Sequence, residues 1–195
     1  MTYIRTVPPS DADGPVREMY QQVEQRFGFI PNWAHLFSLR PGVLGGWNAL
    51  LTSIQSNLPA RTYELATLAA ARALRSSYCS LAHGRVLAQR IFDPPTVAAI
   101  ATNAADTPLT AAERAMMAFA EKVAVSADRI TAADVDLLRS HGYREDEIFD
   151  IAATAAARCF FSKLLDALGA QPDAVFNALD PALRSALTVG QPISE

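Results

Sequence analysis

Apolar residues recur along this chain at the three- and four-residue steps of α-helices, and proline, glycine and capping residues separate the runs. A clear case begins at the capping box Thr110–Glu113, after which Met116, Phe119 and Val123 form one apolar face. The abundance of alanine and leucine favours packed helices over sheet. The pattern therefore predicts an all-α fold, with helices at about residues 10–27, 32–37, 43–56, 59–74, 79–91, 95–102, 110–123, 131–141, 145–168 and 172–187.

The helix that begins near Pro59 is apolar on several faces, so it should be central and buried. Glu64 lies on this helix, where an unpaired carboxylate would be costly to bury. It would therefore need a partner or a proton. The other interpretation places Glu64 in the first helical turns, facing water and favoured by the helix dipole.

A polar break from Arg75 to Tyr78 follows this helix and leads into a helical run that opens with Cys79. His83 comes one turn later on the same face. A cysteine reacts as its thiolate, and because free thiols titrate near ~8.5, a reactive one needs a positive dipole or a base. The helix start supplies the dipole, His83 can take or share the proton, and Glu64 can orient the imidazole. These three residues are predicted to be catalytic.

The composition narrows the classes of function. The 195 residues carry a formal charge of −3, which gives no basic surface for nucleic acid. No apolar run reaches the ~20 residues that span a bilayer, and the N-terminus lacks the apolar core of a signal peptide. We expect a soluble, cytoplasmic protein, with no membrane partner, whose two cysteines stay reduced. Cys159 is interpreted as a small buried hydrophobe.

A metal centre is the rival interpretation of the pair formed by Cys79 and His83. Two ligands one helical turn apart do not suffice for zinc or haem, and no second cluster of cysteine and histidine lies nearby in the sequence. Gly45–Gly46 lies within a helical pattern and matches no nucleotide-binding fingerprint. We therefore predict neither a metal nor a cofactor.

The three candidate residues follow the pattern Glu-x11-Cys-x2-Cys-x3-His, except that Ser76 occupies the first cysteine position. With this pattern the chain, over nearly its whole length, resembles the carboxymuconolactone decarboxylase/alkylhydroperoxidase D superfamily, and in particular its peroxidase-related branch. The resemblance implies a single AhpD-like helical bundle over residues 1–195 that forms a homo-oligomer. Further stretches that carry it are Phe29–Asn32, Leu58–Arg61 and Leu165–Gly169.

A weak internal repeat accompanies this pattern. When Glu147 is laid on Glu64, alanine-rich stretches align and Ser162 falls at the position of the cysteine. Alanine-rich helices align easily by chance. If the repeat is real, residues 31–103 and 110–187 are two related half-repeats that share one core, with one active and one degenerate site.

The resemblance implies a thiol-dependent alkyl hydroperoxide reductase, in which Cys79 is the peroxidatic thiolate activated by His83 and Glu64. In alkylhydroperoxidase D the first cysteine of the motif closes a disulfide, whereas Ser76, the fourth predicted catalytic residue, can only hydrogen-bond or relay a proton. The enzyme would then be of a one-cysteine type, with a small-molecule hydroperoxide as substrate and an external thiol as reductant. Cys159 can resolve the intermediate only if its Cα lies within ~7 Å of that of Cys79.

Two aromatic residues are candidates for the substrate pocket. Tyr78 adjoins the thiol in the sequence, and the segment around Trp33 helps to wall the pocket in the resembled branch. Aromatic residues in such helices more often belong to the core, so simple packing is the other interpretation.

Two other functions stay open. A decarboxylase-like lyase acting on a small carboxylate or lactone needs a general acid or base more than a redox thiol. It also needs a cation for the substrate carboxylate, and Arg61, Arg72 and Arg75 are the candidates. A non-catalytic oligomeric redox sensor would keep the fold and use Cys79 as an oxidation switch.

Overall fold

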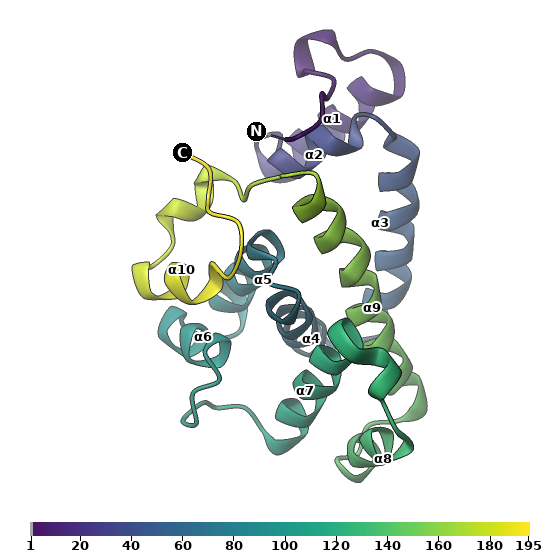
Figure 1. The fold of residues 1–195 in the computed structure, drawn as a ribbon, viewed down its shortest axis with the longest axis vertical. Coiled ribbons are helices and arrows are strands. Elements are labelled where there is room, and N and C mark those ends of the chain that lie inside the picture. Colours follow the sequence, from purple (N-terminus) through teal and green to yellow (C-terminus); the bar gives the residue numbers. More distant parts are fainter. Residues whose placement is uncertain (1) are drawn as a thin grey trace.

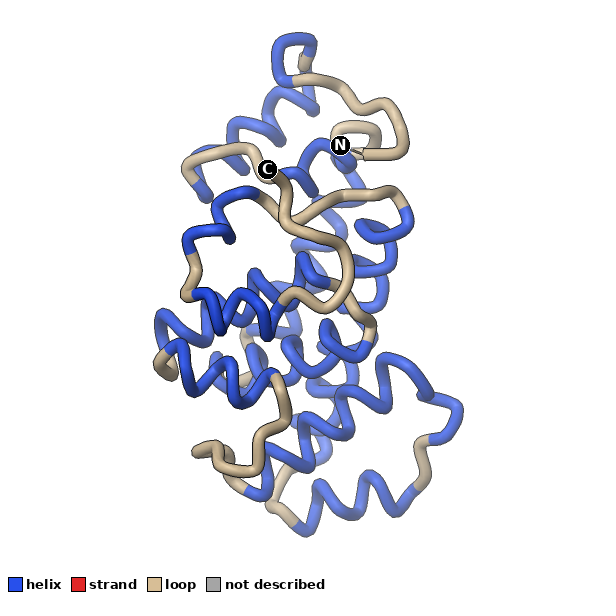
Figure 2. The backbone as a smooth tube through the Cα atoms, turned by 60° about the vertical axis from the view of Figure 1, so that its left-hand side comes forward, coloured by secondary structure: helices blue, strands red, loops and turns tan. Residues whose placement is uncertain are grey.

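The computed structural model describes residues 2–195, and Met1, the first residue of the predicted domain, lies outside them. Within this range the secondary structure is helical with no β-strand, so the predicted all-α class is confirmed (Figures 1 and 2). The α-helices are α1 (Gly14–Phe27), α2 (Asn32–Phe37), α3 (Pro41–Gln55), α4 (Ala60–Ala73), α5 (Ser77–Arg90), α6 (Pro94–Ala101), α7 (Ala111–Ser126), α8 (Ala132–Ser140), α9 (Glu145–Ala167) and α10 (Pro181–Leu187). Short 3₁₀ turns η1 (Pro9–Asp11), η2 (Ala127–Arg129) and η3 (Ala174–Ala178) join some of them.

Helix α4 lies at the centre of the molecule and packs against α5, α7 and α9 (Figure 1). Eight of its 14 residues are buried, and six of these eight are alanine or leucine. Small alanine side chains let neighbouring helix axes approach closely, which explains why one helix can contact three others. The predicted central position of the Glu64 helix is confirmed.

The remaining helices pack mainly on these neighbours or on one another: α6 and α10 on α5, α3 on α9, α8 on α7 and α9, and α1 and α2 on α3. Helices α5, α6 and α10 lie on one side in Figure 1, and α3 and α9 lie on the other. Gly84 allows α10 to pack closely against α5, because a Cβ added there would lie only 2.5 Å from Leu187 Cδ1. Both chain ends lie at the same end of the molecule (Figures 1 and 2).

The structure differs from the predicted boundaries near the site. Helix α5 begins at Ser77 rather than at Cys79, so Tyr78 belongs to the helix and not to the break. Helix α9 runs without interruption from Glu145 to Ala167, whereas the stretch aligned with it in the proposed repeat is broken between α4 and α5. The half-repeats stay a prediction. Within residues 2–195, no helix is long and apolar enough to cross a membrane.

Candidate functional site

A tight turn between α4 and α5 positions the residues of the site. Arg75 adopts the left-handed conformation with φ of 58°. The N–H of Ser76 bonds to the carbonyl of Ala71, and the N–H of Arg75 bonds to that of Arg72, each at 2.9 Å. This is a Schellman motif, with arginine in the place usually held by glycine at a cost of about 1–2 kcal/mol. The chain therefore leaves α4 and enters α5 within three residues.

Helices α4 and α5 bring Glu64 and His83 together. His83 Nδ1 lies 2.6 Å from Glu64 Oε2, and the two side chains are only 18% and 13% exposed. Glu64 therefore faces the imidazole rather than open water. A buried carboxylate needs such a partner, because burying it unpaired would be costly. This geometry matches the base and orienter of the predicted group.

The surroundings of His83 favour its neutral form. Burial lowers the pKa of His83 below its ordinary value of 6.5; the Glu64 carboxylate opposes this shift, and the charge of Arg158 adds to it. Because Nδ1 faces a carboxylate, we assign the ring proton to Nδ1, which donates to Glu64. Nε2 is then left as an acceptor, so His83 can act as a base at neutral pH.

Cys79 lies in the first turn of α5, as predicted, and is 2% exposed. Its charged partner comes from α9: Nη1 of Arg158 lies 3.7 Å from the Cys79 sulfur, and Arg158 is 3% exposed. Among residues 2–195 no hydrogen bond joins Cys79 to His83. The immediate electrostatic partner of the sulfur is therefore an arginine that the sequence analysis did not single out.

No acidic side chain in the described part of the chain forms an ion pair with Arg158. Its Nη2 donates to the Tyr63 hydroxyl at 3.4 Å, and its guanidinium lies 5.6 Å from the ring of Trp47. Burial opposes the positive charge, but Cys79 and Tyr63 outweigh it and raise the pKa of Arg158. A buried cation without an anion is strongly unfavourable. The Cys79 sulfur, which can carry a negative charge, contacts this guanidinium, and the Glu64 carboxylate also favours its charged form.

A sequence signal for Arg158 did exist. The buried face of α9 includes Ile151, Ala155, Phe161 and Leu165, which recur at helical spacing. Arg158 lies in the middle of this face, where the period calls for an apolar side chain. An arginine at such a position indicates a buried cation, and a buried cation indicates an anion close to it.

The two predicted pocket residues contact each other. The Tyr78 hydroxyl donates to the Asp173 carboxylate and accepts from the backbone N–H of Trp33 at 3.4 Å. Burial raises the pKa of Tyr78, and the charge of Asp173 raises it further. The Trp33 ring packs edge-on against Phe161, one turn of α9 after Arg158. Tyr78 thus joins α5 to α2 and to the C-terminal segment.

Cys159 lies on α9 beside Arg158 but faces α7. Its sulfur donates to the carbonyl oxygens of Ala124 and Ala155, each at 3.5 Å, and both cysteines of the chain are free thiols. Within residues 2–195, no three histidine, cysteine, aspartate or glutamate residues are grouped so that they could hold a metal ion.

The arginines suggested as cations for a carboxylate substrate make other contacts or face solvent. Arg61 pairs with Glu113, with an Nη2–Oε2 distance of 3.1 Å. Arg72 donates to the carbonyl of Ala186, and Arg75 is exposed at the turn. Their charges are used in packing the helices or face solvent, so the cation at the thiol is Arg158.

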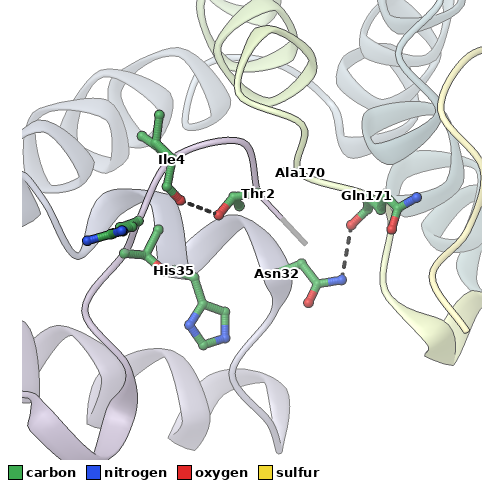
Figure 3. A pocket seen from close by; sticks show the side chains of 8 residues that line it. Thr2, Ile4, Asn32, His35, Ala170 and Gln171 are labelled. Atoms are coloured by element: carbon green, nitrogen blue, oxygen red, sulfur yellow. Dashed lines mark hydrogen bonds between the residues drawn. The ribbon is translucent and has the colours of Figure 1, made fainter.

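A pocket of about 450 Å³ lies between the N-terminal segment, α2 and the chain just after α9 (Figure 3). Asn32 and His35 line it, together with Thr2, Ile4 and Gln171. Cys79, His83 and Glu64 do not. The buried thiol is thus separate from this pocket.

Residues 41–122 match the model of the carboxymuconolactone decarboxylase family. The matched segment begins with α3 and ends within α7, so it includes Glu64, Ser76, Cys79 and His83. No curated protein sequence matches the chain significantly.

Solved structures share the fold over almost the whole chain. An alkylhydroperoxidase AhpD core protein from Ralstonia eutropha, described as peroxidase-related, is 24% identical, with 91% of this chain and 95% of that chain covered and a TM-score of 0.80. A peroxidase-related protein from Silicibacter sp. has the same identity and coverage, with a TM-score of 0.79. The debrominase Bmp8, in complex with 2,3,4-tribromopyrrole, is 21% identical over 96% of both chains, with a TM-score of 0.72.

Proposed function

We propose, for a chain that belongs to the carboxymuconolactone decarboxylase/alkylhydroperoxidase D superfamily, that Cys79 reduces alkyl hydroperoxides at the expense of an external thiol. One observation carries the proposal: Arg158 Nη1 lies 3.7 Å from the Cys79 sulfur in the interior, and no acidic side chain among residues 2–195 forms an ion pair with it. Peroxide reduction needs a nucleophilic thiolate, and a buried guanidinium at this distance favours the anion over the thiol.

The first step uses the sulfur alone as the nucleophile. The Cys79 thiolate attacks the terminal oxygen of the hydroperoxide, an S–O bond forms, and the O–O bond breaks. Cys79 becomes a sulfenic acid, the hydroperoxide is reduced by two electrons, and an alkoxide leaves as the alcohol once it gains a proton. Arg158 remains charged throughout and stabilises the anion before the attack.

His83 and Glu64 fit the second half of the cycle. The neutral imidazole, held by its 2.6 Å contact with Glu64, can take the proton of an incoming thiol. The resulting thiolate attacks the sulfenic sulfur, forms a mixed disulfide and releases water. A second thiol then frees Cys79 and leaves as the external disulfide. Because Ser76 replaces the first cysteine of the motif, an external thiol must supply both electrons.

The test is to trap the oxidised sulfur. Treating the protein with one equivalent of an alkyl hydroperoxide and then with dimedone should label Cys79, and Cys79→Ser should lose both the label and thiol-dependent turnover. A wild-type protein that gains no label at Cys79 contradicts the proposal.

Two further assays separate the other activities of the superfamily. Decarboxylation of a small carboxylate that survives Cys79→Ser but not His83→Ala would favour the lyase. Because the debrominase has the same fold, bromide release from a bromopyrrole is the second assay. Bromide release by a protein that does not react with peroxide would favour dehalogenation by the same thiolate.

A further inference from the structure

Tyr63 comes directly before Glu64 on α4 and has no part in the steps above. It is 3% exposed, whereas the other buried residues of this helix are leucine, alanine and one threonine. A buried tyrosine needs a hydrogen-bond partner for its hydroxyl, which a phenylalanine of nearly the same size does not. Packing alone therefore explains the ring of Tyr63 but not its hydroxyl.

The Tyr63 side chain contacts two of the groups assigned to the reaction. Its hydroxyl accepts a hydrogen bond from Nη2 of Arg158 at 3.4 Å. Its ring packs against the imidazole of His83 in an edge-to-face arrangement, with 6.2 Å between the ring centroids. Glu64, the next residue of α4, contacts the same imidazole at Nδ1. Tyr63 thus links the cation beside the sulfur to the base.

Few groups determine the direction of the Arg158 guanidinium. Nη1 donates to the Cys79 sulfur at 3.7 Å and Nη2 donates to Tyr63, while the buried Nε has no hydrogen-bond partner within residues 2–195. The guanidinium also lies 5.6 Å from the centroid of the Trp47 ring, a contact that attracts the charge without fixing which nitrogen meets the sulfur. In the described part of the chain, the Tyr63 hydroxyl is therefore the one oxygen that orients this cation.

We propose that Tyr63 is a positioning residue whose hydroxyl holds the guanidinium of Arg158 against the Cys79 sulfur. The inference rests on the proposed peroxidase function and assigns a second side chain to the stabilisation of its thiolate. Because the guanidinium is planar and rigid, an acceptor at Nη2 fixes where Nη1 points. Without the hydroxyl a further buried N–H would lack a partner, so turning away from the sulfur to reach another acceptor would become favourable.

The hydroxyl matters most while the sulfur carries no charge. In the sulfenic acid and in the mixed disulfide, Cys79 no longer offers an anion to Arg158, whereas the neutral Tyr63 hydroxyl can still accept from Nη2. A guanidinium that stays in place through these steps is ready to stabilise the thiolate when the second thiol frees it. Tyr63 neither gains nor loses a proton in this role.

The experiment removes the hydroxyl and keeps the ring. Tyr63→Phe is made in a Cys159→Ser parent, so that Cys79 is the only thiol, and the ultraviolet absorbance of the thiolate is followed against pH. The same proteins with Cys79→Ser supply the baseline. We expect the thiolate absorbance of Tyr63→Phe to appear at a pH higher by about half to one than in the parent, as the loss of one hydrogen bond at the cation implies.

A second comparison shows whether the hydroxyl acts through the cation. In an Arg158→Met protein the guanidinium is gone, so adding Tyr63→Phe should move the thiolate titration by no more than about 0.3 in pH. If Tyr63 only fills space between helices, Tyr63→Phe should either move nothing or move the titration equally with and without Arg158.

Tyr20→Phe is the matched control. Tyr20 is also 3% exposed, its hydroxyl donates to the carbonyl of Val7 at 2.6 Å, and its ring packs near the imidazole of His35. Within residues 2–195 it makes no hydrogen bond to Arg158. Tyr20→Phe should therefore leave the thiolate titration in place.

The outcomes separate this role from the proposed function. No shift in Tyr63→Phe, or an equal shift with and without Arg158, overturns the positioning role while the peroxidase function stands. Reaction of the parent protein with tert-butyl hydroperoxide is measured in parallel. If Cys79 does not reduce it, the peroxidase function is overturned, and the thiolate titration still decides whether Tyr63 orients the cation.

Discussion

The two cysteines of this chain differ in what their sulfur atoms face. The Cys79 sulfur faces the guanidinium of Arg158 at 3.7 Å, and the Cys159 sulfur faces two backbone carbonyl oxygens at 3.5 Å. A cation stabilises a thiolate, whereas carbonyl oxygens accept a hydrogen bond from a thiol and offer no positive charge to its anion. Arg158 and Cys159 are neighbours on α9, about 100° apart around the helix, so one helix directs a cation to one sulfur and turns the other away.

Exposure and charge rank the two cysteines in opposite orders. Cys79 is the more deeply buried of the two, so exposure would favour Cys159 as the reactive residue. The positive charge next to the sulfur favours Cys79.

The largest effect should follow from removing the cation. Arg158→Met keeps much of the side-chain volume but leaves Cys79 without a charged partner, so we expect alkyl hydroperoxide reduction to fall by on the order of 100-fold or more. Arg158→Lys keeps the charge without the planar fork and should lose less. Steady-state turnover with a small thiol reductant measures both. An Arg158→Met protein that folds and retains full turnover would rule out the counter-ion role.

The next effect should come from Glu64. Glu64→Gln keeps a hydrogen bond to His83 but removes the charge that orients the imidazole, so we expect thiol-dependent turnover to fall by about tenfold. Wild-type turnover should fall only at a pH below 6.5, since the pKa of His83 is lowered and the base must be neutral. Glu64 opposes that lowering, so Glu64→Gln should move the acid limb of the pH profile to still lower pH.

Arg158 has the opposite influence on His83, which gives an internal check. Its charge lowers the pKa of His83, so Arg158→Met should move the acid limb to higher pH. If the acid limb of the pH profile stays in place in both Glu64→Gln and Arg158→Met, His83 is not the titrating base.

The smallest effect should follow from changing the other cysteine. The Cys159→Ser hydroxyl can still donate to the carbonyls of Ala124 and Ala155. We therefore expect turnover within about twofold of the wild type and a change of less than about 1 kcal/mol in the free energy of unfolding. A denaturant titration and the same turnover assay measure these values. A large loss of turnover would mean that Cys159 takes part in the cycle as a resolving thiol.

Helical periodicity was enough to predict the all-α fold, the central α4 and the place of Cys79 at the start of α5. It did not reveal Arg158, because the partner of the sulfur lies 79 positions away and on another helix. Local pattern carries no information on which face of α9 packs near α5. Arg158 within the apolar face of α9 did indicate a buried cation, but it did not indicate which residue lies next to that cation.

The arginines suggested as cations for a carboxylate substrate make other contacts. Arg61, Arg72 and Arg75 are close to the motif in sequence, but the helix ends direct them to Glu113, to the carbonyl of Ala186 and to solvent. The Schellman turn at Arg75 has no glycine to mark it in the sequence. The homo-oligomer and the external thiol stay predictions.

The most direct test of the central claim is the ultraviolet absorbance of the thiolate in the Cys159→Ser protein, read against a variant that also carries Cys79→Ser. We expect thiolate absorbance from Cys79 at neutral pH, and its loss from the same variant with Arg158→Met. Absorbance that appears only in alkaline solution, as for a free thiol, or that is unchanged by Arg158→Met, would contradict the claim that a buried arginine holds this sulfur as an anion.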